Sequence, residues 1–362
     1  MQNSFNRNIM RWHLERNKRI MPWKGEKDPY KIWISEIILQ QTRVMQGFAY
    51  YNNFIEAFPT LNDLSSAADE AVFKVWEGLG YYSRCKNLLF TARHIQNNLN
   101  GKFPETYENL LKLKGVGPYT AAAISSFAYG LPHAVVDGNV FRVLARFFGE
   151  AIPIDSVKGR EFFTALANEL LPKKSSADFN QAIMDFGATV CKPQLPECRE
   201  CILQKCCLAY NSGLVSTLPV KEKRMVKRNR FFTYFVFKVG EDLLIRKRVG
   251  KDIWENLFEF YLFESNKELS WKQKETKKWL NEQLGITDSS IINISTCYKQ
   301  QLTHQTLSGK FVTVQLQSVP VTLQSFQRLT KKELSLIPFP KFINQYLQEN
   351  ANIIYERKEA II

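Results

Sequence analysis

The chain has 362 residues, which is longer than a usual single domain and predicts two or three hydrophobic cores. Lysine and arginine exceed aspartate and glutamate by 14, and this surplus favours a polyanionic partner such as nucleic acid or an anionic membrane surface. The sequence has no apolar run long enough for a membrane span and no signal-peptide core at its start. We therefore expect a cytosolic protein, or one with access to the nucleus if its source has a nucleus.

The first 27 residues are strongly basic, with Trp12 and Trp23 among the charges. Basic side chains interleaved with aromatic rings suit a phosphate backbone, although a solvated helix face is an equal alternative. The basic residues are Arg7, Arg11, Arg16, Lys18, Arg19 and Lys24.

Asp28 and Pro29 mark a helix start, and apolar spacing predicts a helix over residues 30–51. Glu36 lies on the polar stripe of this helix together with Gln40, but two isoleucines follow it directly. A glutamate on such a stripe is ordinarily solvated. Apolar neighbours can instead raise its pKa and suit it to acid chemistry.

Two further helices are predicted, over residues 64–76 and 83–98, with a glycine-rich bend between them. Tyr81 and Tyr82 lie at this bend. They are either packing residues or a wedge that inserts against bases.

Residues 110–130 predict two helices that meet at a tight turn. Gly115 and Gly117 can take positive φ there, and Pro118 suits the first turn of the second helix. The free N–H groups at such a helix start suit a phosphate, while an ordinary helix connection is the alternative.

Asp137 precedes Gly138 and Asn139 at another predicted helix start, where backbone N–H groups would keep its carboxylate charged. From the sequence alone, a plain helix cap and a catalytic carboxylate are equally good readings. Helices are also predicted over residues 140–148 and 160–170, so the first two hundred residues are expected to be all-helical.

Four cysteines, separated by six, two and five residues, lie within seventeen positions, and a cytosolic chain favours metal binding over disulfides for them. Their spacing suits zinc or an iron–sulfur cluster and does not separate the two. Cys206 is expected to be a bystander. The four candidate ligands are Cys191, Cys198, Cys201 and Cys207.

Residues 216–230 carry a basic run typical of a linker or a DNA-facing arm. Beyond it, residues 231–239 and 243–248 predict a β-hairpin and residues 311–319 a strand. Helices are predicted over residues 271–284, 331–336 and 340–349, so the second domain is expected to be mixed α and β.

Several of these stretches together resemble the helix-hairpin-helix DNA glycosylases, and within that superfamily the adenine DNA glycosylases of the MutY type. They are residues 113–121, 136–140, 35–44 and the four-cysteine spacing. The resemblance implies a helical glycosylase domain over residues 1–215 with an iron–sulfur cluster loop at 191–207. A linker at 216–230 and a Nudix-like domain at 231–362 would follow. It further implies a 4Fe-4S cluster on the four cysteines.

The same resemblance implies the site. Glu36 would protonate adenine, Asp137 would stabilise the sugar cation, and Tyr119 and Asn139 would orient Asp137 and the water. The residues implied to contact DNA or the lesion are Gln41, Thr42, Tyr81, Gly115, Gly117, Thr303 and His304. Leu302 departs from the family pattern, which has an aromatic residue before the hydroxyl and the histidine. Lys24 departs from the common arginine and gives up bidentate geometry.

Tyr119 occupies the position where lyase-active relatives carry a lysine. The expected activity is therefore monofunctional excision of adenine opposite 8-oxoguanine or guanine in double-stranded DNA, by a monomeric cytoplasmic enzyme of the bacterial nucleoid. Two alternatives stay open: a bifunctional glycosylase for oxidised pyrimidines, resembling endonuclease III, and a non-catalytic iron–sulfur DNA-binding protein.

Overall fold

The computed structural model describes residues 2–42, 44–222 and 227–355. Arg43 of the 35–44 motif and residues 223–226 of the predicted linker lie outside the described residues. Contacts divide the chain into two compact units, Met1–Ser66 with Lys86–Arg224 and Ala67–Cys85 with Met225–Ile362. The domain boundaries expected at 215 and 230 stay predictions.

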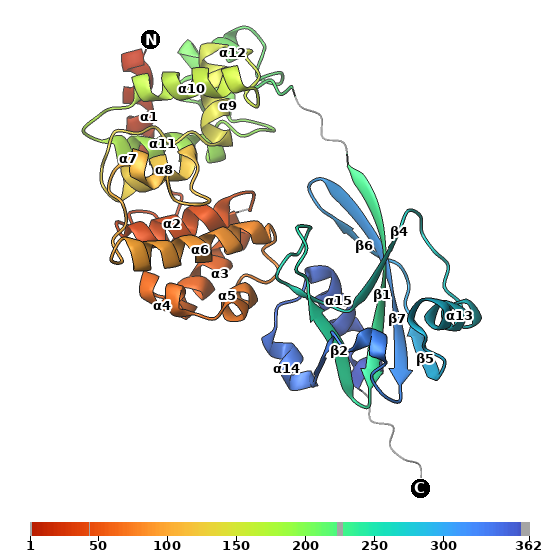
Figure 1. The fold of residues 1–362 in the computed structure, drawn as a ribbon. Coiled ribbons are helices and arrows are strands. Elements are labelled where there is room, and N and C mark those ends of the chain that lie inside the picture. The colour runs from red at the N-terminus through yellow and green to blue at the C-terminus, as the bar shows by residue number, and fades with distance from the viewer. Residues whose placement is uncertain (1, 43, 223–226, 356–362) are drawn as a thin grey trace. The chain divides into compact units, whose positions relative to one another are not determined.

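The first unit is helical (Figure 1), and its described residues contain no strand, as predicted. None of the described helices is long and apolar enough to cross a bilayer. Its helices, together with α6, which begins in the segment 67–85, are α1 Gln2–Glu15, α2 Pro29–Leu39, α3 Val44–Ala57, α4 Leu61–Ser66, α6 Tyr82–Asn98, α7 Tyr107–Leu110, α8 Pro118–Phe127, α9 Gly138–Phe148, α10 Val157–Leu170, α11 Ser176–Thr189 and α12 Leu208–Asn211, with 3-10 turns at Cys198–Glu200 and Gln204–Cys206.

Two helices expected to be continuous are broken. The helix predicted over 30–51 ends at Leu39 and resumes as α3, because Gln41 takes a left-handed φ of 58°. The apolar spacing of the predicted helix included Met45, which is 86% exposed in α3. The helix predicted over 64–76 likewise divides into α4 and α5 (Asp69–Val75).

The core of the first unit forms where α11 contacts α1, α8 and α9. Trp12 is buried in it, edge-on to Phe186 with ring centroids 5.1 Å apart. Trp23 is also buried, 5.4 Å from the ring of Tyr51. Both rings therefore supply packing area and are not exposed among the basic side chains.

The second unit combines helices and strands, as predicted, and is built on a mixed sheet with the strand order β3-β2-β1-β7-β5. β1 and β7 run parallel from Arg228 opposite Gln305 to Val239 opposite Leu316, and the other pairs are antiparallel, including the predicted hairpin of β1 and β2. The strand predicted over 311–319 begins earlier and ends at Leu316. The strands are β1 Arg228–Val239, β2 Asp242–Lys247, β3 Phe258–Glu259, β4 Tyr261–Ser265, β5 Ser289–Ile294, β6 Tyr298–Gln301, β7 Gln305–Leu316 and β8 Gln327–Leu329.

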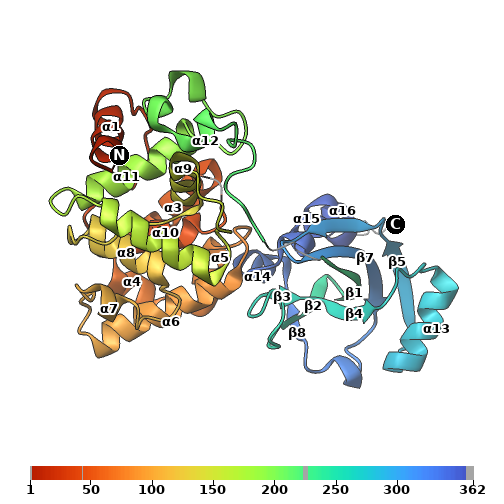
Figure 2. The same cartoon turned by 90° about the horizontal axis from the view of Figure 1, so that it is seen from above.

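Helices cover both faces of this sheet (Figure 2) because neighbouring strand residues point to opposite sides. Phe235 of β1 stacks on Trp279 of α13 (Gln273–Leu284), with ring centroids 4.5 Å apart. Its neighbour Tyr234 faces Phe342 of α15 (Lys341–Glu349) on the other side. The remaining helices of this unit are α14 Lys331–Leu336 and α16 Ala351–Tyr355.

Candidate active site

A cavity of about 760 Å³ lies in the first unit, a size typical of ligand-binding pockets. Its walls come from the irregular segment between α1 and α2, from α2 and the turn that follows it, and from the N-terminal ends of α8, α9 and α11. Seven of the predicted site residues line it. They are Glu36, Gln41, Thr42, Gly117, Tyr119, Asp137 and Asn139.

Glu36 lies on α2, which begins at the Asp28 cap and buries nearly every residue from Tyr30 to Ile38. The side chain is only 5% exposed, and its Oε2 has no hydrogen-bond partner. Burial raises the pKa of Glu36 to about 7, a hydrogen bond from Tyr119 lowers it in part, and the charge of Asp137 raises it further. The predicted raised pKa is therefore present, and Glu36 can hold a proton near neutral pH.

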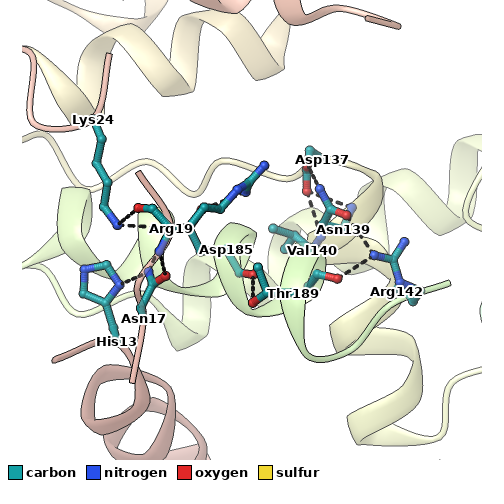
Figure 3. Close-up of polar contacts among 11 residues, drawn as sticks. His13, Asn17, Arg19, Lys24, Asp137, Asn139, Val140, Arg142, Asp185 and Thr189 are labelled. Atoms are coloured by element: carbon teal, nitrogen blue, oxygen red, sulfur yellow. Dashed lines mark hydrogen bonds and ion pairs between the residues drawn. The ribbon is translucent and has the colours of Figure 1, made fainter. Parts of the chain in front are cut away.

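Asp137 caps α9 and faces the same cavity, so the cap reading and the site reading both hold. Its Oδ1 accepts from the backbone N–H groups of Asn139 and Val140, each at 2.8 Å, and its Oδ2 accepts from Asn139 Nδ2 at 2.6 Å (Figure 3). Burial nevertheless raises the pKa of Asp137, although these hydrogen bonds and the charge of Arg142 lower it in part. The expectation that the cap alone sets its charge overlooked this burial.

The two carboxyl groups thus differ in their surroundings. Glu36 accepts one hydrogen bond, from a tyrosine hydroxyl, whereas Asp137 is held by three N–H donors. The three N–H donors favour the ionised form of Asp137, whereas burial in the apolar surroundings of α2 favours the neutral form of Glu36. The arrangement can therefore supply a proton from Glu36 and a negative charge from Asp137 to one bound molecule.

Arg142 fixes the start of α9. Its Nη2 donates to Asn139 Oδ1 and to Gly187 O, both at 2.8 Å, and its Nε donates to Cys191 O at 2.7 Å. Only glycine fits at position 187, because a Cβ there would lie 2.7 Å from Asn139 Cβ. The guanidinium therefore ties the residue that orients Asp137 to α11 and to the cysteine loop.

The turn before α8 differs from the prediction in one glycine. Gly115 has the expected positive φ of 81°, and a Cβ there would lie 2.8 Å from Asn87 Cβ. Gly117 has a φ of −92° and caps α8, so its left-handed assignment was wrong. Gly117 lines the cavity at the start of α8, whereas Gly115 is not among the cavity residues.

The four predicted metal ligands line a second cavity of about 30 Å³, among apolar residues that include Val143 and Phe186. Cys206 is exposed and is not among the lining residues. Among the described residues, no group of three or more His, Cys, Asp or Glu side chains has the arrangement to hold one metal ion. The buried guanidinium of Arg146 donates to Cys191 Sγ at 3.5 Å, so a cation already faces this thiol.

Burial raises the pKa of the Cys198, Cys201 and Cys207 thiols, to about 12 for Cys201, and the neighbouring thiols add to this. Thiolates are the metal-binding form, so ligand binding here would release protons. The four thiols surround one small apolar cavity. This arrangement fits a metal-containing group that binds several thiolates at once.

The predicted lesion-contact residues Tyr81, Thr303 and His304 all belong to the second unit. Tyr81 takes a left-handed φ of 48°, is 39% exposed, and its hydroxyl forms a hydrogen bond with the Thr303 hydroxyl. His304 is exposed, and its carbonyl accepts from the Arg228 N–H at 3.0 Å. Within that unit, the structure brings Tyr81 and Thr303 together. Neither they nor His304 line the 760 Å³ cavity.

Sequence reasoning missed α11 and its buried Asp185, which binds Arg19 and Lys24. An aspartate on a polar helix position looks solvated in sequence, so no signal identified it. Arg19 was noted only as part of a basic run, and Lys24 also as a departure from the family's arginine, yet both line the cavity.

Comparison with known proteins agrees with this architecture. Residues 34–157 match the family model of the HhH-GPD superfamily base excision DNA repair proteins, and residues 233–349 match that of the NUDIX domain. A thermostable thymine-DNA glycosylase superimposes with a TM-score of 0.54 and 31% identity, over 58% of this chain and 97% of its own. An endonuclease III–DNA complex shares the fold, with a TM-score of 0.51 and 21% identity, over 59% of this chain and 98% of its own.

Named relatives extend the match along the chain. An adenine DNA glycosylase of Rattus norvegicus is 42% identical over 229 residues, which is 60% of this chain and 44% of the relative. An adenine DNA glycosylase of Buchnera aphidicola subsp. Baizongia pistaciae is 34% identical over 305 residues, which is 84% of both chains. The chain therefore belongs to the adenine DNA glycosylase family.

Proposed function

We propose that this protein is a monofunctional glycosylase that excises adenine opposite 8-oxoguanine or guanine in double-stranded DNA. The observation that carries the proposal is one cavity in which a buried Glu36, with a pKa of about 7, faces Tyr119 and Asp137. Family membership supports adenine as the base, and the basic charge of +14 supports a DNA partner.

The reaction begins with a base flipped out of the duplex, because a base that is still stacked and paired cannot enter the cavity. Protonated Glu36 donates to adenine N7, so the bond between C1′ and N9 can break with its electron pair going to a neutral leaving base. The sugar becomes cationic and is stabilised by the Asp137 carboxylate beside it, as in other glycoside hydrolyses. Asn139, held by Arg142, orients Asp137, and a water molecule adds to C1′ while its proton passes to the carboxylate left on Glu36.

Tyr119 supports a monofunctional outcome. Its hydroxyl donates to Glu36, and burial raises its pKa well above the usual range, so it stays a neutral phenol. Strand cleavage through a Schiff base needs an amine, which a phenol does not supply. The product would be an intact strand with an abasic site.

The decisive measurement is single-turnover release of adenine from an A:8-oxoguanine duplex, with an A:G duplex alongside it. Release without strand nicking is expected, and failure to release adenine from either duplex would reject the proposal. Nicking of a thymine-glycol duplex without added alkali would favour the bifunctional alternative instead.

Replacing Tyr119 by phenylalanine is expected to move the pH profile of adenine release. The hydrogen bond from Tyr119 lowers the pKa of Glu36, so its removal raises that pKa above about 7. Glu36 then stays protonated to a higher pH, and the alkaline decline of the rate shifts upward. An unchanged or downward shift in the pH–rate profile, measured from pH 5 to 10, would contradict this.

We further propose that Cys191, Cys198, Cys201 and Cys207 hold a 4Fe-4S cluster. Their shared cavity and the buried Arg146 beside Cys191 fit an anionic, multi-thiolate group. Such a cluster would be structural here, bracing the loop that Arg142 connects to α9. The proposal as a whole implies a monomer that acts on DNA in the cytoplasm, with Thr303, His304 and Tyr81 near the 8-oxoguanine.

Substituting Cys198 by serine is expected to remove the cluster and to destabilise the first unit. Purified wild type should contain about four iron atoms per chain and absorb near the edge of the visible range, as expected of a Cys-ligated cluster. Cys206→Ser is the matched control, because that thiol lies outside the cavity. Stoichiometric zinc in the wild type, or iron loss in Cys206→Ser equal to that in Cys198→Ser, would overturn the assignment.

A further inference from the structure

Asp185 is a fully buried carboxylate that the reaction described above does not use. It lies on α11, and its Oδ1 accepts from Arg19 Nη1 at 2.8 Å. Its Oδ2 accepts from Asn17 Nδ2 at 2.8 Å and from Lys24 Nζ at 3.2 Å (Figure 3). Moving a charge from water into the protein interior is costly unless the charge is paired. The three donors provide this pairing for the Asp185 carboxylate.

All three donors come from the segment between α1 and α2, which contains neither helix nor strand. Arg19 and Lys24 from this segment line the 760 Å³ cavity, and their side chains are 22% and 26% exposed. Asp185 is thus a single buried anchor that holds two cations of an otherwise irregular cavity wall.

Arg19 and Lys24 bring two positive charges to this wall, and two carboxylates, Glu26 and Asp178, also line the cavity. Arg19 and Lys24 share one carboxylate, and the nearby His13 adds no further charge at neutral pH, because burial and the charge of Lys24 lower its pKa. Asn17 Nδ2 also lies 3.0 Å from His13 Nδ1, which connects the ring to the same cluster. The wall therefore presents cationic donors to the cavity.

The position of Lys24 depends most on this anchor. A lysine ammonium is a point charge on a flexible stem, without the planar fork of arginine. Its Nζ is held by Asp185 Oδ2 and by Arg19 O at 3.1 Å. Without the carboxylate, only one backbone acceptor would remain among its contacts in the structure.

The same helix also holds the opposite wall. Gly187, two residues after Asp185, packs against Asn139, and its carbonyl accepts from Arg142. α11 therefore ties the wall of Arg19 and Lys24 to the wall of Asp137 through positions one helical turn or less apart.

We propose that Asp185 is a positioning residue for base excision, which orients Arg19 and Lys24 toward the flipped adenine. As the glycosidic bond breaks, its electron pair moves into the protonated base, and the two positioned cations can donate hydrogen bonds to the ring nitrogens that gain electron density. They also match the acceptor nitrogens of adenine. This inference rests on the proposed function, because it requires that adenine occupies the cavity.

The test is single-turnover adenine release by Asp185→Asn, with duplex affinity measured in parallel. Asn keeps the shape but removes the charge, and a small displacement of the cations is expected to slow release by about 10- to 100-fold. Affinity for the A:8-oxoguanine duplex should change by less than about threefold, since phosphate contacts dominate affinity. Thr189→Val is the matched control, because Thr189 bonds only the backbone carbonyl of Asp185, and it should keep the wild-type rate.

Non-additivity separates positioning from a merely structural role. Lys24→Met keeps the pair of Arg19 and Asp185 and should lose about tenfold in rate, which carries the test even where Asp185→Asn folds poorly. Adding Asp185→Asn to it should give a rate no lower than that of Asp185→Asn alone. Wild-type rates in the folded single variants, fully multiplicative losses, or equal losses of affinity and rate would overturn the inference. Absence of adenine release by the wild type would instead reject the proposed function.

Discussion

Replacing Glu36 by glutamine is expected to lower the rate of adenine release about a thousandfold, the middle of the range for the loss of a general acid. Glutamine fills the same space and can still accept the hydrogen bond from Tyr119, but it has no proton to give to adenine N7. In the wild type, the rate should fall as the pH rises through about 7, where Glu36 loses its proton. Glu36→Gln should lose this dependence.

Stability provides the control for Glu36. Burial raises its pKa from 4.5 to about 7, so folding favours the protonated form. The wild type should therefore be most stable below pH 4.5 with respect to this group, and it should lose about 3 kcal/mol as the pH rises through 7. Glu36→Gln has no such loss, so its melting temperature should exceed that of the wild type at pH 9 and match it at pH 5. Equal melting temperatures at both pH values would show that Glu36 is not held in its neutral form.

Replacing Asp137 by asparagine is expected to lower the rate by about 100- to 1000-fold, the usual effect of removing one preorganised electrostatic contact. Asparagine keeps the size of the side chain, and Asn139 and Val140 can still donate to its amide oxygen. The lost quantity is the negative charge beside the sugar cation. Adenine release under single-turnover conditions is the measurement.

The cap role gives the control for Asp137. Asparagine caps helices about as well as aspartate, so the free energy of unfolding should change by less than about 1 kcal/mol. Asp137→Ala should instead lose both the cap and the rate. An Asp137→Asn variant with undiminished release would leave Asp137 as a helix cap alone. A large drop in stability without a drop in rate would lead to the same conclusion.

Local sequence signals predicted much of the fold correctly. Apolar spacing of 3.6 predicted α9 and α6, and the residues that cap or punctuate helices located their starts, as Pro118 did for α8. The hairpin of β1 and β2 followed from two apolar runs around a Gly-Glu-Asp turn. Predictions failed where a single backbone angle decides where a helix ends. Nothing in the apolar pattern of residues 30–51 reveals that Gln41 takes a left-handed φ and ends α2.

The candidate site residues also came from the sequence, because Glu36, Tyr119, Asp137 and Asn139 lie in motifs that resemble a known family; their roles stay predictions. The energetics of these residues did not come from the sequence. The pKa of Glu36 depends on its depth in the first unit and on the hydroxyl of Tyr119, eighty-three positions away in sequence. The raised pKa of Asp137 depends on burial that outweighs three hydrogen bonds.

The sequence by itself determined the two-part architecture, the helix and strand content, and which residues carry acid and thiol groups. These properties depend on short-range patterns of polarity and backbone preference. Only the tertiary structure decided that Asp185, Arg19 and Lys24 form one buried cluster at the wall of the cavity, 161 to 166 positions apart. A carboxylate on a helix is ordinarily solvated, and only the packing of α11 against the segment before α2 removes it from water and gives it these partners.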